Sequence, residues 1–173
     1  SPAIADTYFG GWVAAEILTK EPGRASQLIL ISPLGIKTAD RREHYVADIF
    51  MMPRKELGER MQVGAQGPLQ NIMALPEAPL RRAMRNDEAL SHFGWTPYMC
   101  NPKLAHRLHR ISCPTLVLWG AEDAIVMPRY RDLYARALPQ ASVESIAAAG
   151  HRAHADQPAQ IAARIATFTG EKP

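Results

Sequence analysis

The sequence has no long uninterrupted apolar run, and a membrane-spanning helix needs about 18 such residues. It has only two cysteines, Cys100 and Cys113, whose spacing fits neither a CxxC motif nor a disulfide framework. The N-terminus shows no basic segment followed by an apolar stretch, as a signal peptide would. We therefore expect a cytoplasmic protein with free thiols and no membrane association. The first residue is Ser and not Met, which is consistent with a processed chain, a trimmed chain or a fragment.

The charge balance shows little excess of either sign. Lys and Arg number 20 and Asp and Glu number 17, giving a formal net charge of +3. The basic residues are scattered and are not interleaved with aromatic residues, so we expect no nucleic-acid partner. Apolar residues make up 47% and charged residues 21% of the 173, which is ordinary for a globular protein. This length suits one domain that carries an inserted lobe.

Short apolar runs alternate with helical segments along much of the chain. The runs at 27–32 and 114–119 are apolar on both faces, which favours buried parallel strands, and weak alternation over 142–147 favours a third. Helices are expected at 10–20, 128–138 and 157–168. This alternation predicts an α/β fold with a parallel sheet flanked by helices and right-handed crossovers.

Residues 40–110 differ from the rest of the chain. They are rich in Met, Arg and Glu, and proline interrupts them repeatedly, which favours several short helices. We expect a helical cap inserted into a core made of 1–39 and 111–173. The alternative is an independent helical domain, although no Gly/Ser-rich linker flanks the segment.

Polar residues follow the predicted strands at the edge where open α/β sheets place their sites. Asp123 follows the strand at 114–119, and His151 follows the strand at 142–147. In an acid–base pair, such a carboxylate orients the imidazole and stabilises the imidazolium. A turn at 6–11 precedes the first helix. The chain order of turn, acid and base is that of nucleophile, acid and base in α/β-hydrolases.

Four segments resemble the α/β-hydrolase fold family in the family's own order. They are FGGWVAAE at 9–16, LILISPLGIK at 28–37, CPTLVLWGAED at 113–123 and AGHRAHADQP at 149–158. They are similar to the start of the helix after the nucleophile elbow, the next strand with the cap entry, the acid-bearing strand and the histidine loop. The resemblance therefore implies the C-terminal portion of a capped α/β-hydrolase.

The resemblance is greatest to the branch that includes esterases and carbon–carbon bond hydrolases of aromatic ring-cleavage products. It implies hydrolysis of an ester or a carbon–carbon bond next to a carbonyl in a small acyl or aromatic substrate. His151 would be the general base, Asp123 its orienting acid and the Phe9 N–H an oxyanion donor. Trp95 is a candidate for lining the substrate pocket, with simple packing in the cap as the alternative. This chemistry needs no metal or organic cofactor, so we expect none.

The elbow departs from the family's G-x-S-x-G pattern. Aligned on Gly10, the chain has Asp6 at the first glycine and Tyr8 at the serine, which is the nucleophile position. A phenol has a pKa of about 10, and its oxygen lies too far from the backbone for the usual oxyanion geometry. Asp6 places a side chain where the turn is tight, so we expect strain there.

The sequence also offers alternatives for the nucleophile, for metal binding and for the function. Substitute nucleophiles would be Thr7, Ser32 or Cys100. The histidine pairs at 106/109 and 151/154 lack a third ligand, so no metal site is expected.

The resemblance places the family's earlier strands and a second oxyanion donor before residue 1. A sheet without those strands exposes apolar surface, so we expect a homo-oligomer. The alternative function is therefore a catalytically inactive remnant that binds a partner or its own copy.

Overall fold

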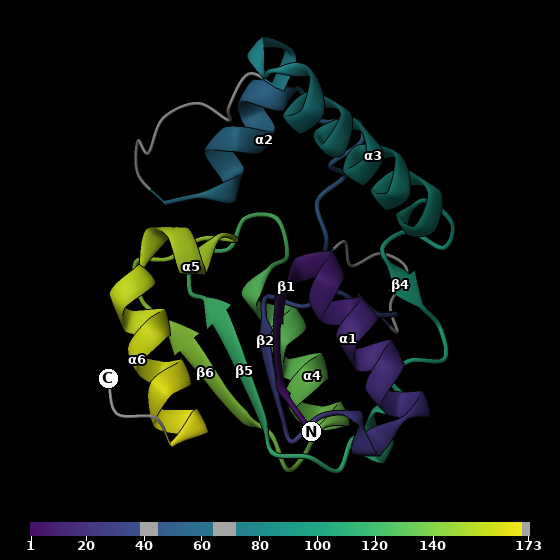
Figure 1. The fold of residues 1–173 in the computed structure, drawn as a ribbon, viewed down its shortest axis with the longest axis vertical. Coiled ribbons are helices and arrows are strands. Elements are labelled where there is room, and N and C mark those ends of the chain that lie inside the picture. The colour runs from purple at the N-terminus through teal and green to yellow at the C-terminus, as the bar shows by residue number, and fades with distance from the viewer. Residues whose placement is uncertain (39–44, 64–71, 171–173) are drawn as a thin grey trace.

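The computed structural model describes residues 1–38, 45–63 and 72–170, and its centre is a four-stranded parallel sheet. The strand order is β1-β2-β5-β6, with every neighbouring pair parallel. The strands are β1 (Ala3–Thr7), β2 (Gln27–Ile31), β5 (Thr115–Gly120) and β6 (Ser142–Ile146). The predicted parallel α/β sheet is confirmed (Figure 1).

Helices cover both faces of this sheet. The helices are α1 (Tyr8–Lys20), α4 (Arg131–Ala137), α5 (Ala153–Asp156) and α6 (Pro158–Thr169). Successive side chains of a strand point to opposite faces, and β2 shows the result. Leu28 and Leu30 pack in the cluster with α1 and α4, whereas Ile29 and Ile31 pack with α5 and α6. The four central residues of the run at 27–32 are all apolar because neither face of β2 meets solvent there.

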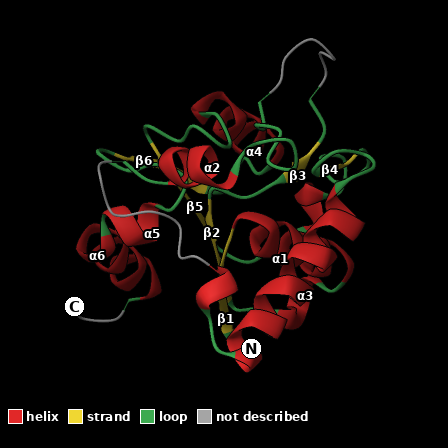
Figure 2. Cartoon of the chain, turned by 90° about the horizontal axis from the view of Figure 1, so that it is seen from above, coloured by secondary structure: helices red, strands yellow, loops and turns green. Residues whose placement is uncertain are grey.

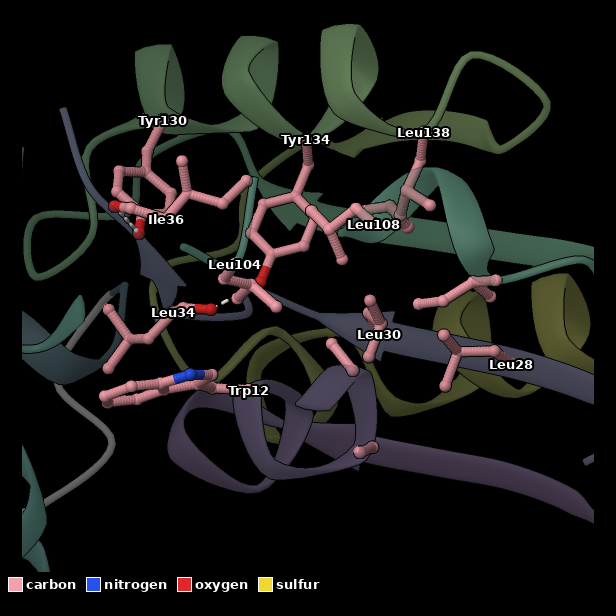
Figure 3. Packing of buried hydrophobic residues seen from close by; sticks show 14 of the residues in the cluster. Trp12, Leu28, Leu30, Leu34, Ile36, Leu104, Leu108, Tyr130, Tyr134 and Leu138 are labelled. Atoms are coloured by element: carbon pink, nitrogen blue, oxygen red, sulfur yellow. Dashed lines mark hydrogen bonds between the residues drawn. The ribbon is translucent and has the colours of Figure 1, made fainter. Parts of the chain in front are cut away.

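The larger of the two clusters contains two buried tyrosines, which Figure 3 shows from close by. The Tyr134 hydroxyl donates to the Leu34 carbonyl, and the Tyr130 hydroxyl donates to the Ile36 carbonyl at 2.5 Å. Buried hydroxyls need such partners. The two bonds fasten α4 and the turn before it to the chain that leaves β2.

Two helices of the inserted segment lie over the carboxyl ends of the strands (Figures 1 and 2). They are α2 (Arg54–Met61) and α3 (Glu77–Gly94), with a 3-10 turn at Ile72–Ala74 before α3. The segment also contains β4 (Cys100–Asn101), which pairs in parallel with β3 (Gly35–Ile36), and Val46, which bridges Val126. Neither pairing was predicted from the sequence.

The boundaries at 39/40 and 110/111 stay a prediction. The parts of the predicted cap at 40–44 and 64–71 lie outside the described residues. Within the described part of the chain, no helix combines the length and apolar character needed to cross a membrane.

Candidate active site

The chain turns sharply between β1 and α1, and Tyr8 is the residue at the turn. Its φ of 50° lies in the left-handed region, which side chains rarely adopt. Asp6 fits beside it because Gly10 has no side chain: a Cβ on Gly10 would lie 2.1 Å from Asp6 Oδ1. That oxygen accepts the Thr7 N–H at 2.7 Å. In this turn the positive φ belongs to Tyr8, whereas the Asp6 side chain is exposed and fits against Gly10.

Asp123 lies three residues beyond β5, in a loop that fixes both of its carboxylate oxygens. Oδ1 accepts the N–H of Ile125 at 2.9 Å and of Val126 at 2.8 Å. Oδ2 lies 2.9 Å from His151 Nδ1. Asp123 is 3% and His151 5% exposed, so the contact is shielded from water. This geometry suits the His151 tautomer that carries its proton on Nδ1 and donates it to the Asp123 carboxylate.

The acid loop and the histidine loop meet at two glycines. A Cβ on Gly120 would lie only 2.0 Å from the Gly150 carbonyl oxygen. The backbone N–H groups of Ala121 and Glu122 donate to the carbonyls of Ile146 and Ala149, both at 2.9 Å. The close approach of the two backbones brings Asp123 and His151 within hydrogen-bond distance.

The Tyr8 ring fills the space beside the imidazole. The centroids of Tyr8 and His151 are 4.5 Å apart, and the rings are nearly perpendicular, at 85°. The Tyr8 hydroxyl is buried and has no hydrogen-bond partner among the described residues. Burial, with smaller effects of Tyr98 and Asp123, raises the pKa of Tyr8 well above its ordinary value. Tyr8 is therefore a neutral phenol at physiological pH and is not hydrogen-bonded to the residue that would activate it.

The three other candidate nucleophiles lie on three different strands or strand ends, and within the residues that the structure describes none of them is bonded to His151. Thr7 is the last residue of β1, and Ser32 follows β2 beside it, buried and with a φ of 45°. Like the Tyr8 hydroxyl, Ser32 Oγ has no partner in the described part of the chain. Cys100 lies in β4, and burial raises the pKa of its thiol. In the described residues, the imidazole hydrogen bond goes to Asp123 and to none of these three.

Phe9 lies in the first turn of α1, where N–H groups have no acceptor within the helix. Its ring packs edge-on against Trp12, with centroids 5.3 Å apart. The N–H of Phe9 is therefore placed where an anion could accept a hydrogen bond. Its role as an oxyanion donor stays a prediction.

A cleft of about 600 Å³ lies between the inserted segment and the acid loop. Its lining residues are Val46, Ala47, Asp48, Arg60, Trp95, Tyr98, Ala124 and Met127. Trp95 is 57% exposed and packs against Phe50, with ring centroids 5.4 Å apart. Ala124 directly follows Asp123, so the cleft borders the acid loop. In the part of the chain that the structure describes, no cluster of His, Cys, Asp and Glu could hold a metal ion.

Sequence reasoning missed Asp156, whose carboxylate accepts the N–H of Gly150 at 2.7 Å. It also missed Tyr98, whose hydroxyl donates to the Ala47 carbonyl at 2.6 Å at the edge of the cleft. The only sequence signal for Asp156 was a weak one, its position five residues after His151. Nothing in the local sequence pointed to the second.

Comparison with known proteins matches residues 9–164 to the model described as "Alpha/beta hydrolase family". The mouse sn-1-specific diacylglycerol lipase ABHD11 is 26% identical over 92% of this chain and 56% of its own length. The 2-hydroxy-6-oxo-6-phenylhexa-2,4-dienoate hydrolase of a Rhodococcus strain is 16% identical, with a TM-score of 0.73 over 97% of this chain and 63% of that one. A serine hydrolase from Cycloclasticus zankles is also 16% identical, with a TM-score of 0.67 over 97% and 64%. The chain thus spans little more than half the length of these relatives.

Proposed function

The chain belongs to the alpha/beta hydrolase family, and from this premise we propose that its site is built for hydrolysis of an ester or a carbon–carbon bond next to a carbonyl. The observation that carries the proposal is the buried contact of 2.9 Å between His151 Nδ1 and Asp123 Oδ2, beside the turn at Tyr8. Asp123 holds the imidazole through Nδ1, so Nε2 is the nitrogen that accepts a proton from a nucleophile and returns it to the leaving group. The N–H of Phe9 donates to the oxyanion.

The same geometry makes this chain a very poor catalyst as it stands. The Tyr8 phenol keeps its proton, and its ring packs on His151 without a hydrogen bond from its hydroxyl. A nucleophile misplaced by about 1 Å can cost on the order of 100-fold in rate.

We propose a small acyl or aromatic substrate that lies in the cleft beside Trp95. The cleft volume of about 600 Å³ is within the usual range for small-molecule sites. Two of the relatives are named as a lipase and as a hydrolase of a phenylhexadienoate. These names support an ester or a carbon–carbon bond as the target. The free thiols of Cys100 and Cys113 support the proposed cytoplasmic location.

The test is hydrolysis of a p-nitrophenyl ester by the wild-type chain, His151→Ala, Tyr8→Ser, and Tyr8→Ser combined with His151→Ala. We expect turnover near background for the wild type and a small gain for Tyr8→Ser that the His151 substitution removes. Robust wild-type turnover that disappears in His151→Ala would mean that another residue is the nucleophile. Ser32, the buried hydroxyl at the end of β2, would then be the first residue to replace.

A non-catalytic, self-associating protein is the second candidate function. In the described residues β1 is one of the two edge strands of the sheet and pairs only with β2. Val13 and Ile17 of α1, the helix that follows it, are 43% and 38% exposed. An open strand edge beside exposed apolar side chains favours pairing with another chain. Light scattering combined with the ester assay separates the two candidate functions. An obligate dimer that does not hydrolyse the ester supports the self-associating protein, and a monomer that hydrolyses it contradicts that function.

A further inference from the structure

Asp156, the last residue of α5, joins the histidine loop to a segment 93 residues away in the sequence. Its Oδ2 accepts the N–H of Gly150 at 2.7 Å and the N–H of Val63 at 3.1 Å. Gly150 directly precedes His151, and Val63 lies just after α2. One carboxylate oxygen therefore binds the backbone of the loop that carries the imidazole and the backbone of the inserted segment.

A second hydrogen bond fastens the other side of the same loop. The N–H of Arg152 donates to the Met61 carbonyl at 2.9 Å. Both sequence neighbours of His151 thus have their N–H groups bound, one by the carboxylate and one by the end of α2. The two backbones are in close contact: a Cβ on Gly150 would lie 3.3 Å from Val63 N.

These contacts set the backbone from which the imidazole projects, whereas Asp123 holds the ring itself. Hydrogen bonds to a carboxylate are stronger than those between neutral groups, so the anchor is firm. We propose that Asp156 is a positioning residue that couples the placement of His151 to the segment 61–63. The proposal rests on the proposed function for the role of His151 as a base. The coupling itself is a property of the folded chain and is measurable without turnover.

The experiment reads the His151 ring by ¹⁵N NMR in the wild type, Asp156→Ala, Asp156→Asn and a control, Asp132→Ala. Asp132 is an aspartate of α4 whose exposed ion pair with Arg131 is weak, at 3.7 Å. We expect one tautomer, with the proton on Nδ1, in the wild type and in the control. Asp156→Ala should lose this single state and show both tautomers. Asp156→Asn should restore it, because its side-chain oxygen can still accept both N–H groups.

Ring signals in a folded Asp156→Ala that match those of the wild type would overturn the proposal. Equal disturbance in the Ala and Asn variants would overturn the assignment to hydrogen bonds accepted by the side-chain oxygen. If Asp156→Ala does not fold, amide hydrogen exchange of the wild-type chain decides the question. We expect the amides of Gly150 and Val63 to open together, and exchange rates that differ by more than about tenfold after correction for intrinsic rates would contradict the coupling. Failure to hydrolyse esters would leave each of these readouts intact, so the two proposals fail separately.

Discussion

Replacing Gly120 by Ala tests whether contact between two loop backbones assembles the acid–base pair. A Cβ at this position would lie 2.0 Å from the Gly150 carbonyl oxygen and 2.5 Å from that of Ala149. Both neighbours are backbone atoms, so no side-chain rotation relieves the overlap. The loops must move apart by about 1.4 Å to restore an ordinary contact of 3.4 Å.

The separation has two energetic consequences. Overpacking of a close contact costs about 1–3 kcal/mol. The hydrogen bond of 2.9 Å from the Glu122 N–H to the Ala149 carbonyl weakens as well, and a lost hydrogen bond costs on the order of 1 kcal/mol. We expect Gly120→Ala to lower the free energy of unfolding by about 3 kcal/mol. For a chain of this size, that corresponds to a decrease in Tm of roughly 6–12 °C.

Urea unfolding followed by circular dichroism measures this loss, with Gly23→Ala as the matched control. A Cβ on Gly23 would meet no atom within 4 Å, so the control should change stability by less than about 0.5 kcal/mol. The ¹⁵N signals of His151 should also report a longer distance to Asp123 in Gly120→Ala. If the two alanine variants unfold within about 0.5 kcal/mol of each other, the close approach of the loops does not determine their positions.

Two further outcomes follow from buried polar groups. Asp123→Ala should lower the free energy of unfolding by about 3 kcal/mol in a urea titration, because it strands two backbone N–H groups of its own loop and His151; a loss under about 1 kcal/mol would contradict the geometry. Burial raises the pKa of Tyr8, Tyr130 and Tyr134 in the folded chain, so all three keep their protons there while the same side chains ionise near pH 10 in the unfolded chain. Their contribution to stability is full below pH 10 and falls above it by about 1.4 kcal/mol per pH unit for each tyrosine. Unfolding measured from pH 9 to 11 should show this fall, and Tyr134→Phe should reduce its slope by about a third, because Tyr8 and Tyr130 still contribute; a slope that the substitution leaves unchanged would refute the cause.

The fold followed from the sequence because its signals are local. The run at 27–32 is apolar at each of its four central positions, and β2 is buried on both faces. The pattern at 114–119 predicted β5 for the same reason. The positions of Asp123 and His151 after their strands put both residues at one edge of a parallel sheet, and their roles stay predictions. In the turn where the sequence predicted strain, the positive φ falls on Tyr8, and the sequence does not show that the Asp6 side chain lies over Gly10.

The tertiary structure alone decided how the parts of the site meet. The distance of 2.9 Å between the acid and the imidazole depends on the approach of two glycine backbones, which no strand pattern encodes. The Tyr8 pKa depends on burial by elements from several parts of the chain, so the residue type could not give it. Asp156 holds an N–H group 93 residues earlier, and a hydrogen bond to a backbone N–H requires no particular side chain at the donor. A residue sequence therefore records which side chains are present at a site but not which distant backbone groups hold them there.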